Sequence, residues 1–192
     1  MHTLGSELRT RRLLLRRLEL EDEAAVMSYR GDPNASRFLQ HAPMQNGEYK
    51  EWHSERSEEW HLHKPGNRRF YGITELLSGE LIGDAVLVRL PDGRQVEIGM
   101  FLNPRTAGLG YSMEAGSALL ELVFNRLEFR RTVCKTNSAN HGAIKAITRM
   151  GLSFEGHFQI RESVDNEWMD TFMYSISADQ WKNSNIRAIS RN

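Results

Sequence analysis

The chain has 192 residues, and its 25 lysines and arginines are balanced by 25 aspartates and glutamates. This length suits one domain with a sizeable core, and the absence of a basic excess argues against binding to nucleic acids or anionic membranes. The single cysteine, Cys134, excludes an internal disulfide bond and is predicted to be a buried, unreactive thiol in a reducing compartment. No apolar run approaches the ~20 residues that span a bilayer, and the N-terminus alternates arginine with leucine rather than carrying the apolar core of a signal peptide, so we expect a cytoplasmic protein.

The first predicted element is a half-buried strand within residues 8–18, with Leu13 and Leu15 on its inner face. The arginines of this segment are Arg9, Arg11, Arg12, Arg16 and Arg17. They could contact RNA or the ribosome. Acidic residues follow at once within residues 19–23, so local ion pairs are the favoured interpretation.

Two helices are predicted next. Asp22 can cap a short helix through Tyr29, and a second helix is predicted over residues 47–63, closed by a Lys-Pro-Gly turn. The aromatic side chains of the second helix are Tyr49, Trp52 and Trp60. We expect them to pack on a sheet, with a wall of a substrate groove as the alternative.

Three histidines of this segment, His53, His61 and His63, raise the question of a metal site. On a helix, His61 and His63 would point to different faces, and no cysteine or clustered carboxylate completes a ligand set. We therefore predict solvated histidines and no metal.

The middle of the chain predicts three strands. Residues 70–77 and 81–89 form a hairpin across a Ser-Gly turn, in which Gly83 marks a bulge or a close approach of backbone. The β-branched and aromatic run Val96–Leu102 predicts the third strand, and Pro104 ends it because proline cannot donate to a ladder.

The second half of the chain alternates helices with strands. Its predicted elements are a helix to about Leu127, a strand over Arg131–Asn137, a helix from Asn140 that Gly151 ends with a left-handed cap, and strands over 152–160 and 168–176. A polar tail follows Trp181. The order predicts one α+β domain over residues 1–181, with residues 182–192 as the tail.

The turn Ala107-Gly108-Leu109-Gly110 joins a predicted strand directly to a predicted helix. This geometry suits a phosphate, because the first-turn amides of a helix lack partners and its dipole favours negative charge. A nucleotide P-loop would need a lysine after Gly110, and a dinucleotide fingerprint would need a glycine where Met113 stands. Residues 105–110 instead match the Gln/Arg-x-x-Gly-x-Gly/Ala pattern of coenzyme A acyltransferases.

Four motifs in this order resemble the GNAT N-acetyltransferases, and within them the RimJ/RimL-type branch that acetylates the N-termini of ribosomal proteins. The motifs lie at residues 97–101 (Glu-Ile-Gly-Met-Phe), 108–115 (Gly-Leu-Gly-Tyr through Glu-Ala), 140–143 (Asn-His-Gly-Ala) and 151–156 (Gly-Leu-Ser-Phe-Glu-Gly). The resemblance spans about residues 8–181 and implies a GNAT-like domain: a mostly antiparallel sheet, splayed at its middle and flanked by about four helices. Anchored on Tyr111, the family's loop falls on residues 107–112. Ala107 then departs from the Gln/Arg position, and Arg105 fits only the alternative register.

The resemblance implies acetyl-CoA as acyl donor, a primary amine as acceptor, direct attack in a ternary complex, and no metal. The pantetheine arm would lie between strands 97–102 and 131–137, and an amide near Gly99 to Phe101 would stabilise the oxyanion. The residues implied to bind the coenzyme are Met100, Phe101, Leu102, Ala107, Gly108, Leu109, Gly110, Tyr111, Ser112, Asn140 and Lys145. Asn140 can also cap its helix, and Lys145 can also be a solvated surface lysine.

Two carboxylates are candidates for the catalytic base: Glu162, which follows the Glu-Gly motif, and Glu97. The family serine that can protonate the leaving thiolate falls on Ala143. Ser138, Tyr111 or water could replace it, and the change also leaves open a protein that binds coenzyme A, or senses it, with little turnover. The acceptor is not specified by these motifs, and the resemblance allows a homodimer.

Overall fold

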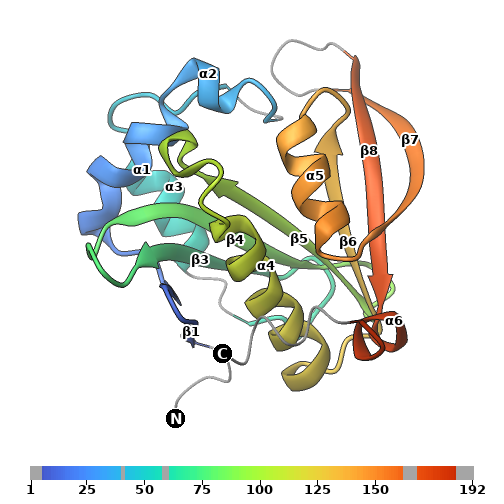
Figure 1. Cartoon of the computed structure of the whole chain (residues 1–192). Helices are drawn as coiled ribbons and strands as arrows, with labels where there is room; N and C mark the ends of the chain where they lie inside the picture. Colours follow the sequence, from blue (N-terminus) through green and yellow to red (C-terminus); the bar gives the residue numbers. More distant parts are fainter. Residues whose placement is uncertain (1–5, 40–41, 58–60, 162–167, 185–192) are drawn as a thin grey trace.

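Eight strands form one sheet in the computed structural model, which describes residues 6–39, 42–57, 61–161 and 168–184 (Figure 1). The strands are β1 (Leu8–Arg9), β2 (Leu13–Arg16), β3 (Arg68–Glu75), β4 (Leu81–Arg89), β5 (Gln95–Leu102), β6 (Arg131–Asn137), β7 (Ser153–Arg161) and β8 (Trp168–Ser177). Their order across the sheet is β1-β2-β3-β4-β5-β6-β8-β7. Neighbours are antiparallel except β5 and β6, which run parallel, so the predicted α+β class and mostly antiparallel sheet are confirmed.

The described residues form six α-helices, of which two are short. They are α1 (Glu23–Arg30), α2 (Pro33–Ser36), α3 (Tyr49–Ser57), α4 (Tyr111–Glu121), α5 (His141–Arg149) and α6 (Ala178–Lys182). A π-helical turn, η3 (Leu122–Arg126), extends α4 to the predicted end near Leu127, and 3-10 turns occupy η1 (Leu20–Asp22) and η2 (Pro104–Thr106). The sequence did not predict the short α6, which a Ser177–Gln180 capping box begins and whose Trp181 is fully buried.

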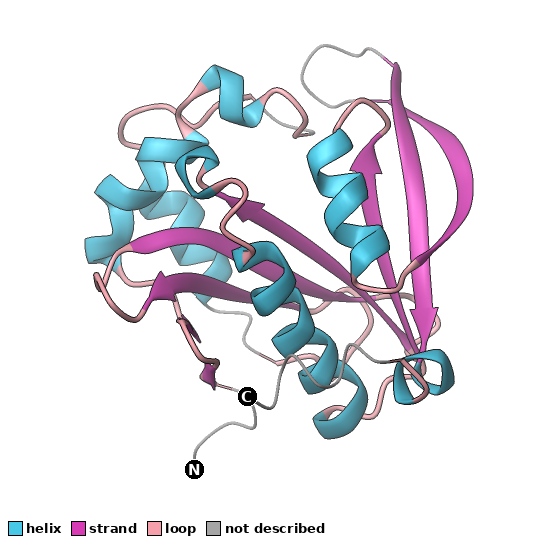
Figure 2. Ribbon diagram, viewed as in Figure 1, coloured by secondary structure: helices cyan, strands magenta, loops and turns pink. Residues whose placement is uncertain are grey.

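Helices α4 and α5 cover one face of the sheet, and α1 and α3 cover the other (Figure 2). Side chains alternate between the faces along each strand. On β5, Ile98 therefore joins the larger core with α4 and α5, whereas Phe101 packs against the smaller core with Tyr29 of α1 and Tyr49 of α3. Strand β5 thus contributes side chains to both layers.

The predicted helix over residues 47–63 is wrong in its second half. Helix α3 ends at Ser57, residues 58–60 with Trp60 lie outside the described part, and His61 and His63 follow in a loop with their rings stacked at 5.1 Å. The main-chain carbonyls of Leu62 and His63 accept hydrogen bonds from Arg89 at 2.8 and 2.7 Å. In a helix these carbonyls would instead accept hydrogen bonds from main-chain N–H groups of the same helix.

The described residues contain no group of three or more His, Cys, Asp or Glu side chains arranged to hold a metal ion. Within the same ranges, no helix has the length and apolar character needed to cross a membrane.

The arginines of the first strands take part in two separate contacts. Arg16 forms a bidentate ion pair with Asp22, at 2.8 Å to each carboxylate oxygen, which confirms the predicted local pairing. Arg12 instead pairs with Glu114, 102 residues away in the sequence. Leu13 and Leu15 are fully buried, as predicted. The N-terminal segment is therefore tied to the sheet and to helix α4.

Candidate active site

Strands β5 and β6 pair with each other over only three residues, Gln95–Glu97 against Arg131–Val133. Beyond this point β5 stays paired with β4 as far as Leu102, and β6 stays paired with β8 as far as Asn137. The two strands therefore part, which confirms the predicted splay and is visible in Figure 2. Their facing edges keep main-chain N–H and C=O groups that a neighbouring strand would otherwise bond, so an extended ligand can bond them.

A cleft of about 760 Å³ lies between the parted strands. Ile98 to Leu102 form one wall and Cys134 to Thr136 form the other. Residues along α4 and α5 close one side, and residues from the segment 32–39 close another. Of the predicted coenzyme residues, Met100, Phe101 and Leu102 therefore lie on a wall of this cleft.

The loop between β5 and α4 presents main-chain N–H groups at one end of the cleft. Gly108 and Gly110 both have φ +80°, a left-handed conformation that glycine adopts without strain, and Gly110 caps α4. In the described part of the chain, no backbone acceptor bonds the amides of Gly108, Gly110 or the first helical turn, residues 111–113. Ala107, Gly108 and Ser112 line the cleft, whereas Leu109, Gly110 and Tyr111 do not.

Arg12 holds this loop from outside the cleft. Its Nη1 donates to the Leu109 carbonyl at 2.9 Å, and its Nε donates to Glu114 Oε2 at 2.7 Å. Because the C=O and N–H of a trans peptide point in opposite directions, fixing the Leu109 carbonyl also fixes the direction of the Gly110 N–H. No local pattern in the sequence indicated this role for Arg12, since its partners lie about a hundred residues away.

Glu114 anchors the same contact. It is 8% exposed and also accepts hydrogen bonds from Thr10 Oγ1 and from the Arg12 main-chain N–H, both at 2.7 Å. Burial alone would raise the pKa of Glu114, but the hydrogen bonds from Thr10 and Arg12 outweigh burial and lower it. The carboxylate therefore stays ionised and keeps Arg12 in place.

Tyr111 turns its side chain away from the cleft. Its hydroxyl donates to Glu75, which raises the pKa of Tyr111 and lowers that of Glu75, and the Arg12 guanidinium lies 4.5 Å from its ring centroid. Neither Tyr111 nor Ser138 lines the cleft. The Tyr111 hydroxyl is thus directed away from the place where a leaving thiolate would need a proton, which corrects the expectation that it could serve there.

Helix α5 brings Asn140 and Ala143 to the cleft. The Asn140 side chain accepts a hydrogen bond from the Ala143 N–H at 3.1 Å, so it caps the helix as predicted. Lys145 lies on the exposed side of α5 and does not line the cleft. The Ala143 position itself carries only a methyl group.

The sequence profile described as "Acetyltransferase (GNAT) domain" matches residues 12–153 of the chain. The chain belongs to the GNAT acetyltransferase family. This acetyltransferase is 26% identical over 172 residues to YnaD of Bacillus subtilis (strain 168), named an uncharacterized N-acetyltransferase, in a match that covers 90% of this chain and 97% of YnaD.

Two solved structures show the same fold. A GNAT-family acetyltransferase from Bacillus anthracis has a TM-score of 0.80 at 22% identity, covering 90% of this chain and 99% of that one. A spermidine N-acetyltransferase from Vibrio cholerae, solved in complex with CoA and spermine, has a TM-score of 0.75 at 18% identity, with the same coverage of 90% and 99%. Both likenesses concern the fold alone.

The chain is an acetyl-CoA-dependent acyltransferase, and its described residues fit that donor. When bound, acetyl-CoA supplies an activated thioester. The free edges of β5 and β6 can bond the amides of a pantetheine arm, and the bare amides at the start of α4 suit its diphosphate. Cys134 is 6% exposed on the β6 wall of the cleft, and burial raises the pKa of its thiol to about 12, which disfavours the thiolate that a nucleophile requires.

Glu97 lies where the two strands part, and it is paired rather than free. Lys135 Nζ donates to Glu97 Oε2 at 2.7 Å, with the two side chains 38% and 26% exposed. Lys135 lines the cleft, a position that no sequence motif indicated. The other candidate base, Glu162, lies outside the described residues.

A buried ion pair supports the β5 wall of the acetyltransferase from behind. Arg30 Nε donates to Asp84 Oδ2 at 2.8 Å, and Tyr29 donates its hydroxyl to the same carboxylate at 3.0 Å. Phe101 packs edge-on against Tyr29 at 5.4 Å, and the Arg30 guanidinium lies 5.3 Å from its ring centroid. These contacts fix the Phe101 side chain, and with it one wall of the cleft.

The aromatic residues of α3 belong to this support. Tyr49 is fully buried and stacks on Trp52 at 5.7 Å, and Trp52 lies against the Arg30 and Arg56 guanidinium groups at 5.1 and 4.3 Å. Neither ring lines the cleft. The predicted packing role is confirmed for Tyr49 and Trp52, which belong to the smaller core.

Proposed function

We propose that this acetyltransferase transfers the acetyl group to a primary amine by direct attack in a ternary complex. The observation that carries the proposal is that the parted edges of β5 and β6 and the bare-amide loop before α4 line one cleft. Met100, Phe101 and Leu102 would flank the pantetheine arm, and residues 107–112 would hold the diphosphate. Asn140 would contact the coenzyme while capping α5.

An N–H of β5 between Gly99 and Phe101 would stabilise the negative charge that develops on the thioester oxygen. A donor of this kind typically contributes ~10²–10³ in rate. The Tyr29–Arg30–Asp84 contacts behind Phe101 would keep this part of the strand in place, which is what a preorganised donor requires.

We propose an α-amine as the acceptor, such as a protein N-terminus. An α-amine with a pKa of ~8 costs about 0.8 kcal/mol to deprotonate at pH 7.4, whereas a lysine or aliphatic amine near ~10.4 costs about 4 kcal/mol. Glu97, the second base candidate, is ion-paired with Lys135, which favours an acceptor that needs little help to lose its proton. The motif order, which resembles the ribosomal-protein branch, supports the same class.

Glu162 would act as the general base, directly or through a water, and Glu97 is the second candidate. The leaving thiolate would take its proton from water, because a thiol pKa of about 8.5 makes it a fair leaving group.

A second candidate function is coenzyme A binding with little turnover. The methyl group of Ala143, at the position of the family serine, is the observation that favours it. This alternative predicts the same coenzyme site without thiol release.

The test follows free thiol release from acetyl-CoA with three acceptors: a peptide with a free N-terminus and no lysine, an N-acetylated peptide with one lysine, and spermidine. The N-acetylated form of the first peptide is the matched control. We expect release with the first peptide and little with the others. Release with spermidine or lysine alone would refute the α-amine, and coenzyme binding without release from any amine would establish the alternative.

A further inference from the structure

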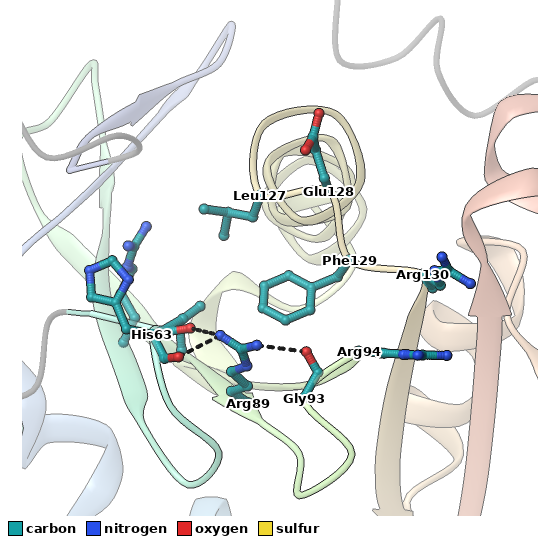
Figure 3. A pocket seen from close by; sticks show the side chains of 10 residues that line it. His63, Arg89, Gly93, Arg94, Leu127, Glu128, Phe129 and Arg130 are labelled. Carbon is teal, nitrogen blue, oxygen red and sulfur yellow. Dashed lines mark hydrogen bonds between the residues drawn. The ribbon is translucent and has the colours of Figure 1, made fainter.

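A second cavity, of about 390 Å³, lies at the other end of β5 and β6 from the cleft (Figure 3). We call it the arginine pocket, because its described lining residues include Arg69, Arg89, Arg94 and Arg130 but only one carboxylate, Glu128. Three of the elements that line the coenzyme cleft begin or end here. Arg94 directly precedes β5, Arg130 directly precedes β6, and the extension of α4 ends at the pocket.

Arg89 carries a positive charge that no carboxylate of the described residues neutralises. Its Nη1 donates to the carbonyls of Leu62 and His63, and its Nη2 donates to the Gly93 carbonyl at 2.9 Å (Figure 3). Its Nε is buried without a hydrogen-bond partner. Main-chain dipoles orient this guanidinium but leave its full charge in place.

Five other half-buried or buried arginines of the described chain differ from Arg89 in this respect. Those with a carboxylate oxygen at 3.2 Å or less are Arg12, Arg16, Arg30, Arg56 and Arg131. Buried charges in proteins are normally paired, because an unpaired one loses its hydration without compensation. Among the described residues, the half-buried Arg89 therefore lacks the carboxylate partner that these five arginines have.

Arg94 and Arg130 add positive charge at the opposite edge of the pocket from His63 (Figure 3). The Arg130 N–H donates to the Arg94 carbonyl at 3.0 Å, so the two residues are held next to each other, and both are exposed. No ion pair joins either to a carboxylate in the ranges that the structure describes. The buried Phe129 ring lies between them and Arg89, with the Arg89 guanidinium 5.5 Å from its centroid.

We propose that the arginine pocket binds a small oxyanion ligand with at least two negative charges, carried as phosphate or carboxylate groups. The guanidinium groups would hold the charged groups, since they match both anions in geometry. Leu127 and Phe129 would contact the uncharged part of the ligand. The site is separate from the coenzyme cleft and does not depend on the proposed acceptor.

The test is calorimetric titration of the full chain with sodium phosphate and, in a separate arm, with citrate, each against sodium chloride at matched ionic strength. Saturating coenzyme A is present throughout, so that phosphate and citrate cannot bind in the coenzyme cleft and contribute to the measured heat. We expect one saturable site for at least one of the two probes. Binding of phosphate alone assigns a phosphoryl ligand, and binding of citrate alone assigns a carboxylate ligand.

The variant Arg94→Gln/Arg130→Gln should weaken this binding at least tenfold, and Arg89→Gln should do the same. Because Arg94 and Arg130 are exposed, the double variant keeps the test valid if Arg89→Gln fails to fold. The matched control is Arg9→Gln/Arg149→Gln, which removes the same charge from exposed positions elsewhere and should change affinity less than twofold. Absence of saturable binding by either probe, or equal losses in the two double variants, overturns the proposal.

Discussion

The two ends of β5 and β6 differ in strand pairing and in the groups that surround them. At one end the strands are joined by three residue pairs, and arginines surround a pocket beside the junction. At the other end they separate, and the loop before α4 presents backbone amides and a helix terminus to a negatively charged group. Charge from arginine is visible in a sequence, whereas charge from bare amides depends on backbone conformation. The two ends must therefore be tested by different kinds of substitution.

The largest effect is expected from Gly110→Val. A β-branched residue at φ +80° would force the loop to rearrange. Loss of two amide–diphosphate bonds at about 1.5–3 kcal/mol each would weaken coenzyme A binding by roughly 100-fold or more. Calorimetry with coenzyme A measures this change directly.

Gly79→Val is the matched control for this variant. Gly79 has φ +74° in the β3–β4 turn, with open space around its Cβ position. It should lose thermal stability and leave coenzyme affinity unchanged. If the two variants lose affinity equally, the amide loop is not the diphosphate site.

The next largest effect is expected from the base. Removing a general base typically costs 10²–10⁴ in rate, and an acceptor with a low pKa places Glu162→Gln near the lower figure, about 10²-fold in kcat. The pH profile of kcat should lose its lower limb, while the KM for acetyl-CoA should change little. If Glu97→Gln produces this pattern and Glu162→Gln does not, the assignment must be reversed.

Arg12→Met should act on the coenzyme and leave the chemistry intact. It releases the Leu109 carbonyl, and we expect the KM for acetyl-CoA to rise about tenfold, which corresponds to one charge-assisted hydrogen bond. The decisive readout is kcat/KM for acetyl-CoA relative to S-acetylpantetheine, which has no diphosphate. This ratio should fall only if the loop no longer binds the diphosphate of the coenzyme.

Arg16→Met tests whether the effect is merely structural. It breaks a pair of similar length, 2.8 Å to Asp22, at a position four residues after Arg12 in the chain. Both variants should lose stability, because each leaves a largely buried carboxylate without its cation. A fall of the donor ratio in Arg16→Met would show that the ratio reports stability and not Arg12.

The smallest effect is expected from Ala143→Ser. A hydroxyl at this position could protonate the leaving thiolate, and we expect kcat to rise two- to fivefold, as water already performs part of this role. A large increase from a nearly inactive parent would instead favour the coenzyme-binding alternative. Ala143→Val, which adds volume but no group that can donate a proton, serves as the control.

The sequence was informative wherever short-range rules apply. The hairpin, the parting strands, the Asn140 cap and the left-handed Gly151 all follow from local patterns or from the resemblance to a family. The end of α3 could not be predicted, because the carbonyls of Leu62 and His63 bond Arg89 from a strand that comes later in the chain.

The residues that position the site were harder to foresee. Arg12 finds Glu114 across 102 residues, Tyr111 turns to Glu75 across 36, and Lys135 meets Glu97 across 38. Local sequence patterns would predict that the charged and hydroxyl groups of each pair are exposed to solvent. The sequence alone therefore predicts the loop between β5 and α4, but not the long-range side-chain contacts that position it.

Hydrogen–deuterium exchange with and without coenzyme A tests the central claim most directly, because it reports both ends of β5 and β6 at once. We predict strong protection on binding in peptides that cover residues 98–102 and 108–113, and no change in peptides that cover 127–130. Protection that is absent from the first two segments, or that appears at the arginine pocket instead, would contradict the account.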